Sequence, residues 1–143
     1  MRNKFIHGGV GIWSHKDLTI KPISLNQFCS DKDIEVCCVS YTNPAKGKFL
    51  IVNCYRSPSG NLQVFCDNIE KILNLLWKPD SNIILVGDFN LDPNRDSKQY
   101  TPLNNILSTY NLKNIINKPT REKYTLDHIY VNKVYDFLTL NYN

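Results

Sequence analysis

The sequence predicts an α/β protein in which a mixed sheet is flanked by helices. Segments typical of strands outnumber amphipathic segments, and two of them are joined by a short turn, as in a hairpin. A further segment is apolar throughout, which is typical of a strand in the middle of a sheet. The amphipathic segments repeat their apolar residues every three to four positions, so each packs one face against the sheet.

Most of the strand segments are short, apolar and β-branched. Residues 34–41 and 49–55 predict strands that pair across a Pro-Ala-Lys-Gly turn at 44–47. Residues 82–86, Asn-Ile-Ile-Leu-Val, predict a strand buried on both faces. A turn at 8–13 is expected to enter an earlier strand, and further extended segments are expected at 112–116, 125–131 and 134–140.

Two segments predict amphipathic helices. The first opens at Ser59-Gly-Asn61 and ends near Pro79, and the second surrounds Leu107. Their apolar positions are Leu62, Phe65, Ile69, Ile72, Leu73 and Leu76 in the first helix, and Leu103, Ile106, Leu107 and Tyr110 in the second. No repeat or linker divides the chain, so residues 1–143 are interpreted as a single domain or part of one.

Composition excludes several classes of protein. With 42% hydrophobic residues the chain is not disordered, and it contains no apolar run of the roughly 18–20 residues that a membrane helix needs. The N-terminus shows no secretory signal. Seventeen basic and thirteen acidic side chains give a net charge of +4, which permits a polyanionic partner without requiring one.

The five cysteines show no metal-binding spacing. Cys37 and Cys38 are neighbours on an expected strand, so their thiols point to opposite faces and cannot share a metal. Buried, reduced thiols in an intracellular protein are the expected state of the whole set, which also contains Cys29, Cys54 and Cys66.

The strongest local signal for chemistry is Gly87-Asp-Phe-Asn90, directly after the apolar strand. Asp88 and Asn90 are two residues apart, which places both side chains on one face of a strand, while Phe89 points into the packing. A carboxylate can orient or deprotonate water, and an amide can donate to a phosphate oxygen. The alternative is that both residues only begin a turn. Gly87 allows close approach of backbone or ligand.

Tyr55-Arg56-Ser-Pro58 is the second candidate, at the end of an expected strand. The Tyr55 phenol could contact a phosphate and Arg56 could pair with one. The alternatives are a tyrosine that packs at the rim of the sheet and an arginine that is solvated.

The third candidate is a basic segment followed by a strand. Between Ser97 and Leu126 the only acid is Glu122, and this excess of Lys and Arg suits backbone phosphates, although it is also typical of a solvated face. In the strand that follows, Asp127 shares a face with Ile129 and therefore needs a partner. His128 lies on the other face and is interpreted as structural.

These motifs occur in one order along the chain: Gly8-Gly-Val-Gly-Ile12, Val52–Gly60, Ile84–Asn90, Lys118-Pro-Thr-Arg121 and Thr125–Asn132. In that order and spacing the chain resembles the endonuclease/exonuclease/phosphatase superfamily. More narrowly, it resembles the endonuclease domain of animal non-LTR retrotransposons, which is usually fused to a reverse transcriptase. The resemblance covers nearly the whole chain.

The resemblance implies a sandwich of two sheets flanked by helices and Mg²⁺-dependent cleavage of phosphodiesters, with DNA as the expected partner. Asp88 then activates water, Asn90 orients the phosphate, Tyr55 stabilises developing charge, and Asp127 hydrogen-bonds a catalytic histidine. The residues expected to contact phosphate or DNA are Arg56, Lys118, Thr120 and Arg121. Tyr55, Asp88, Asn90 and Asp127 are thus expected to converge on one site.

Two parts of the family pattern are missing. The family has an Asn and a metal-binding Glu before the Gly8-Gly9 turn, and a Ser-Asp-His motif on its last strand, and neither is found here. The metal ligands are therefore unknown, and an incomplete domain with impaired cleavage is expected. The alternatives are a non-catalytic module that binds nucleic acid or another protein chain, and a phosphodiesterase that acts on a substrate other than DNA.

Overall fold

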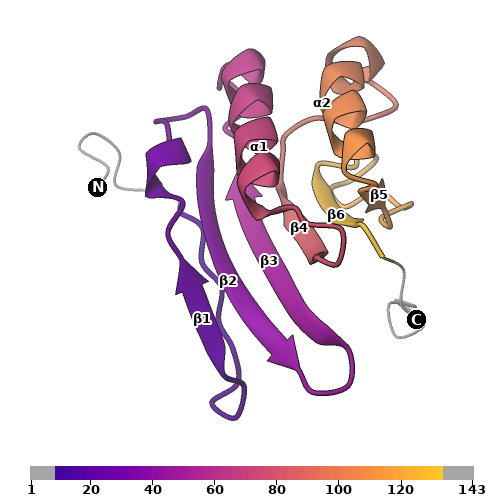
Figure 1. The fold of residues 1–143 in the computed structure, drawn as a ribbon. Helices are drawn as coiled ribbons and strands as arrows, with labels where there is room; N and C mark the ends of the chain where they lie inside the picture. The colour runs from indigo at the N-terminus through magenta and orange to yellow at the C-terminus, as the bar shows by residue number, and fades with distance from the viewer. Residues whose placement is uncertain (1–8, 134–143) are drawn as a thin grey trace.

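The fold is built on one mixed sheet with both helices on the same face, as the computed structural model of the chain shows for residues 9–133 (Figure 1). The strand order is β1-β2-β3-β4-β6-β5, in which β3 and β4 run parallel and every other pair is antiparallel. The strands are β1 (Ile20–Ile23), β2 (Glu35–Asn43), β3 (Gly47–Tyr55), β4 (Asn82–Asp88), β5 (Lys113–Asn114) and β6 (Asp127–Val131); the helices are α1 (Leu62–Leu76), α2 (Ser97–Thr109) and a 3-10 turn (Asn26–Phe28).

The hairpin and the first helix follow directly from local sequence. The β2–β3 hairpin turns where Asn43 Oδ1 accepts the backbone N–H groups of Ala45 and Lys46. Helix α1 is capped at its N-terminus by Asn61, whose side-chain oxygen accepts the N–H groups of Gln63 and Val64. The helix then crosses back over the sheet, so that β4 pairs parallel to β3. The strand pair, α1 and α2 are thus confirmed.

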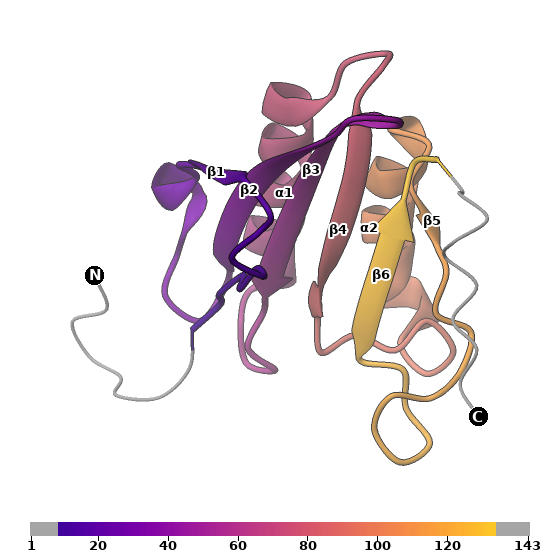
Figure 2. The same ribbon diagram turned by 90° about the horizontal axis from the view of Figure 1, so that it is seen from below.

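The core lies between the sheet and the two helices, and in Figure 2 both helices lie behind the sheet. Alternate residues of the central strands, such as Val52, Cys54, Ile83 and Leu85, are at most 1% exposed on this face. They pack against apolar side chains of α1 and α2, which include Phe65, Ile69, Ile72, Leu73, Leu103 and Leu107. The α/β class is therefore confirmed, and residues 9–133 account for one of the two sheets that the resemblance implies.

Several details differ from the sequence-based expectations. Residues 9–13 form no strand; the first strand is β1, which is short and contains Pro22, as edge strands can. β4 is not buried on both faces, because Ile84 and Val86 are only half-buried on the face away from the helices. The expected extended segments shrink to β5 and β6, and 134–140 lie outside the described residues.

The cysteines are free, but not all are buried. Cys38, Cys54 and Cys66 are buried, Cys37 is half-buried and Cys29 is exposed, so the expectation of five buried thiols is wrong for the last two. Cys37 and Cys38 lie on β2, as expected. No helix in the described part of the chain has the length and the apolar character needed to cross a membrane.

Candidate active site

Three of the four expected catalytic residues lie in one row across the sheet. Tyr55 at the end of β3 is the register partner of Asp88 at the end of β4, and Asp88 is the partner of Asp127 at the start of β6. Register partners point to the same face, and neighbouring strands are about 4.8 Å apart. Cys54 and His128, the neighbours of Tyr55 and Asp127 along β3 and β6, are buried on the face that the helices cover. Because side chains alternate along a strand, the row lies on the opposite face.

Gly87 permits this arrangement at the end of β4. Its φ is +149°, and a Cβ atom built on it would lie 1.7 Å from the carbonyl oxygen of Cys54 on β3. No side chain fits that space, so any other residue at this position would push β4 away from β3. Gly87 was expected to allow the close approach of backbone or ligand, and what it allows is the close approach of the β3 backbone at Cys54.

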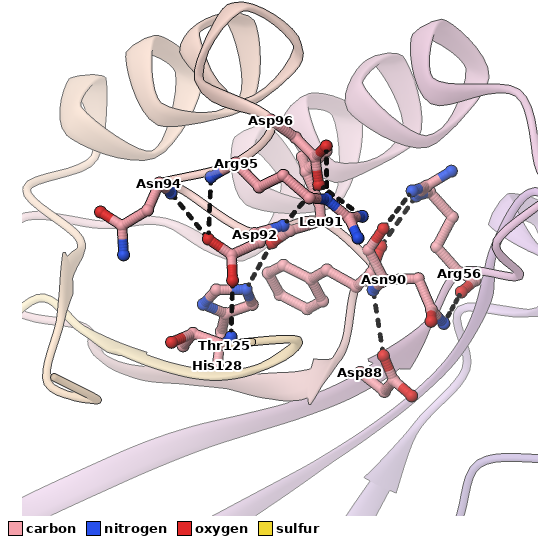
Figure 3. Close-up of polar contacts among 11 residues, drawn as sticks. Arg56, Asp88, Asn90, Leu91, Asp92, Asn94, Arg95, Asp96, Thr125 and His128 are labelled. Carbon is pink, nitrogen blue, oxygen red and sulfur yellow. Dashed lines mark hydrogen bonds and ion pairs between the residues drawn. The ribbon is translucent and has the colours of Figure 1, made fainter. Parts of the chain in front are cut away.

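Asn90 lies beside Asp88, but the two residues do not share one face of a strand as their spacing predicted. β4 ends at Asp88, and Asn90 follows in a left-handed turn with φ +49°. Its backbone N–H donates to Asp88 Oδ1 at 3.0 Å, and its side-chain Nδ2 donates to the carbonyl oxygen of Arg56 at 2.8 Å (Figure 3). Phe89 is fully buried against Phe65 and Tyr130, as expected.

Arg56 is not solvated, which corrects the sequence-based alternative. Its side chain is 5% exposed, and its guanidinium donates to the carbonyl oxygens of Phe89, Gly60 and Asn90 at 2.8, 2.9 and 2.8 Å. Burial lowers the pKa of Arg56. These three hydrogen bonds join Arg56 to Gly60 and to the residues after β4, and contact of Arg56 with a phosphate stays a prediction.

The basic segment reaches the row through Arg121. Arg121 Nη2 lies 3.3 Å from Asp88 Oδ2, and its side chain is 58% exposed, so the guanidinium faces both the carboxylate and solvent. Thr120 Oγ1 accepts the backbone N–H groups of Leu126 and Asp127, each at 3.1 Å, and so sets the start of β6. Lys118 is exposed on the same loop.

Two buried side chains that sequence analysis did not assign to the site connect its loops. Asp92 accepts N–H groups from Asn94 and Arg95 on Oδ1 and from Thr125 on Oδ2 at 2.7–3.1 Å (Figure 3). Burial alone would raise its pKa, but the three backbone donors together with Arg95 lower it. Asp92 therefore ties the loop after β4 to the residues that begin β6.

His128 makes the second connection. Its Nε2 lies 3.0 Å from the carbonyl oxygen of Leu91, and its Nδ1 lies 2.9 Å from Asn114 Nδ2. A carbonyl only accepts and an amide nitrogen only donates, so the ring is neutral with its proton on Nε2. Burial lowers the pKa of His128, which favours this neutral form. The structural interpretation of His128 agrees with these contacts.

Glu35 was also missed. It is the register partner of Tyr55 and extends the row by one strand, so the row across β2, β3, β4 and β6 is Glu-Tyr-Asp-Asp. Its position follows from counting back through the hairpin from the turn, a signal that was present in the sequence. Asp92 gave no such signal, because its partners are backbone groups that only the fold brings near.

The described residues do not complete a metal site by themselves. No group of three or more His, Cys, Asp or Glu side chains within residues 9–133 is arranged to hold a metal ion. Asp88 and Asp127 face each other across β4 and β6, and two like charges in this position repel. Of the described residues, only Arg121 is ion-paired with either carboxylate.

No protein-family model matches the sequence, and no curated protein does. Among solved structures, the chain is similar to the endonuclease domain of TRAS1, a telomere-specific non-LTR retrotransposon, with 16% identity and a TM-score of 0.64. That match covers 82% of this chain and 55% of the TRAS1 domain, so the chain spans about half of that domain's length.

Two further structures are similar over a smaller part of the fold. An endonuclease/exonuclease/phosphatase family protein from Leptotrichia buccalis shows 22% identity and a TM-score of 0.49, over 68% of this chain and 41% of its own. The human Nocturnin catalytic domain shows 18% identity and a TM-score of 0.49, over 70% and 41%. The sheet order, the two helices and the TRAS1 match together show that residues 9–133 adopt part of the fold of that endonuclease domain, as the resemblance to the endonuclease/exonuclease/phosphatase superfamily implied.

Proposed function

We propose that this chain carries part of a DNA endonuclease domain of the retrotransposon type, which hydrolyses phosphodiesters. The observation that supports this most is the row of Tyr55, Asp88 and Asp127, with Arg121 on Asp88. These residues come from four separate segments, and an acid, a phenol and an exposed guanidinium beside one another suit attack of water on a phosphate.

Each residue has a role in this proposal. Asp88 orients and deprotonates the attacking water, and the Tyr55 phenol donates to charge that develops on the phosphate. Asn90 orients the phosphate through its side-chain amide, which has a second hydrogen beyond the one given to Arg56. Arg121, Lys118 and Thr120 bind neighbouring phosphates of DNA, and Arg121 exchanges Asp88 for a phosphate when substrate arrives.

Mg²⁺ is the cofactor that the resemblance implies, and it belongs to the proposal. The described residues offer it the two facing carboxylates of Asp88 and Asp127 and no complete ligand set, so no step is derived through it. Of the described residues, none hydrogen-bonds the Asp127 carboxylate. We propose impaired cleavage for this reason, because loss of one member of a hydrogen-bonded catalytic set typically costs on the order of a hundred- to ten-thousand-fold in rate.

The test is nicking of supercoiled plasmid DNA by the full chain with Mg²⁺. Asp88→Asn keeps the size of the side chain and removes the base, so nicking is expected to fall at least a hundred-fold. Asp80→Asn is the matched control: Asp80 is exposed in the turn before the same strand, at its other end, and the same change there is expected to leave the rate unchanged.

The outcomes separate the competing functions. Slow nicking that is lost in Asp88→Asn and kept in Asp80→Asn supports the endonuclease. Salt-sensitive DNA binding without nicking supports the non-catalytic nucleic-acid module. A protein that neither nicks nor binds DNA, but hydrolyses bis(p-nitrophenyl) phosphate and loses this activity in Asp88→Asn, supports a phosphodiesterase with another substrate.

A further inference from the structure

Arg56 contacts every residue of the segment that carries Asp88 and Asn90. Its backbone N–H donates to the carbonyl oxygen of Asp88 at 3.0 Å, and its side chain donates to the carbonyl oxygens of Phe89 and Asn90. Its own carbonyl accepts from Asn90 Nδ2 at 2.8 Å. Main chain and side chain of one residue thus hold three consecutive residues that lie far away in the sequence (Figure 3).

The charge of Arg56 indicates that the contact does more than fill space. Within the described residues no carboxylate is ion-paired with the guanidinium, which is buried among backbone carbonyls. A buried charge with no direct ion pair is costly, although the carboxylates of Asp88 and Asp96 favour it from a distance. The three hydrogen bonds to carbonyl oxygens are therefore what the guanidinium supplies at this place. A planar fork with several fixed donors is what three carbonyls at different angles require.

The contact also reaches the catalytic carboxylate. Asn90 has a left-handed backbone, which Asn adopts more readily than most residues, and its side chain and its carbonyl oxygen are both hydrogen-bonded to Arg56. In that conformation its N–H points at Asp88 Oδ1 at 3.0 Å. Whatever fixes Asn90 therefore fixes the orientation of Asp88 as well.

We propose that Arg56 is a positioning residue, which holds the Asn90 turn and through it aims both the Asn90 amide and the Asp88 carboxylate at the substrate. This rests on the proposed function for its effect on rate, but its effect on the turn does not depend on catalysis. Because a positioning residue acts through Asn90 and Asp88, the loss of Arg56 lowers kcat and leaves KM nearly unchanged.

The experiment compares Arg56→Met, Arg56→Lys and the control Asn82→Ala in the full chain. Asn82 is buried at the other end of β4, and its Nδ2 donates to the carbonyls of Lys46 and Lys48, so its loss also weakens the fold, but far from the site. The readouts are amide hydrogen exchange by NMR at Asn90, backbone and side chain, and kcat and KM for plasmid nicking.

In Arg56→Met, exchange at both Asn90 amides is expected to rise at least ten-fold relative to the amides of α1, and kcat to fall ten- to hundred-fold with KM within three-fold. Arg56→Lys is expected to lie between Met and wild type, because an ammonium keeps the charge but cannot span three carbonyls. Asn82→Ala is expected to change neither readout selectively.

Unchanged exchange at Asn90 in Arg56→Met overturns the proposal, and so does an equal rise in Asn82→Ala. If Arg56→Met does not fold, Arg56→Lys decides: wild-type exchange at Asn90 overturns the proposal and a selective rise supports it. If wild-type protein does not nick DNA, the proposed function fails, while exchange at Asn90 still tests the positioning role.

Discussion

The two loops beside the Tyr55–Asp88–Asp127 row are built in opposite ways. In the loop after β4, Phe89, Leu91 and Asp92 are at most 2% exposed, and the Asp92 carboxylate and the Leu91 carbonyl oxygen are hydrogen-bonded within the protein. In the loop before β6, Lys118, Arg121 and Lys123 are exposed. Asp88, the acid, ends β4 directly before the first loop, which carries the amide of Asn90, and the second loop carries positive charge.

The difference shows that the site holds its catalytic side chains in fixed orientations and leaves its basic side chains free to change partners. Buried, fully bonded polar groups hold a side chain in one orientation, which a base aimed at water needs. Exposed cations change partners at little cost, which suits a group that leaves Asp88 when a phosphate arrives. Substitutions in the buried loop after β4 are therefore expected to affect stability most, and substitutions in the exposed loop before β6 least.

The largest effect is expected for Asp92→Ala. Removal of the buried carboxylate leaves the N–H donors of Asn94, Arg95 and Thr125 without an acceptor, and that of Thr125 is buried, so the free energy of unfolding is expected to fall by about 2–3 kcal/mol. Urea denaturation measures it. A loss below about 1 kcal/mol would show that water replaces the carboxylate and that the loop is not fixed by Asp92.

A smaller and pH-dependent effect is expected for His128. Its pKa is lowered in the folded protein, so its contribution to stability is complete above the unfolded pKa of about 6.5 and is lost as the pH falls toward the folded pKa. His128→Gln should cost about 1–2 kcal/mol at pH 7.5, where the neutral ring bonds Leu91. It should also flatten the decrease in Tm between pH 7 and pH 5, measured by calorimetry.

The same decrease in Tm in both proteins would contradict this assignment, since it would place the titrating group elsewhere. His15→Gln is the control. His15 is exposed, so this substitution is expected to leave the decrease in Tm between pH 7 and pH 5 unchanged.

The smallest effect on stability is expected for Arg121→Gln. An exposed ion pair contributes little, so the free energy of unfolding should change by less than about 0.5 kcal/mol. Binding to duplex DNA should weaken, and the slope of log K against log salt should decrease by about one. An unchanged slope would remove Arg121 from the phosphate-binding residues.

The secondary structure was largely predictable, because it follows from local patterns. The hairpin needs only the alternation of its strands and the 44–47 turn, and α1 needs only its apolar face and Asn61. β1 was missed because four residues with a proline carry too little pattern. The half-buried face of β4 was missed because an apolar run does not reveal what covers each side.

The site was predictable only as far as motif and register allow. Tyr55, Asp88 and Asp127 each stand at a strand end, and the resemblance indicated that they meet. The buried role of Arg56 was not predictable, since its acceptors at Phe89 and Asn90 are carbonyls, which any residue supplies. Every residue has a backbone carbonyl, so residue types do not reveal which carbonyls will accept a hydrogen bond from a given side chain.

The pairing of β6 between β4 and β5 has a consequence for the order of folding. The β2–β3 hairpin joins neighbours in the sequence and can form early, whereas Asp88 meets Asp127 only after α2 and the basic loop have closed a long stretch of chain. We therefore expect β2 and β3 to pair before β6 joins β4, so that the two carboxylates meet only after their own strands have formed most of their other contacts.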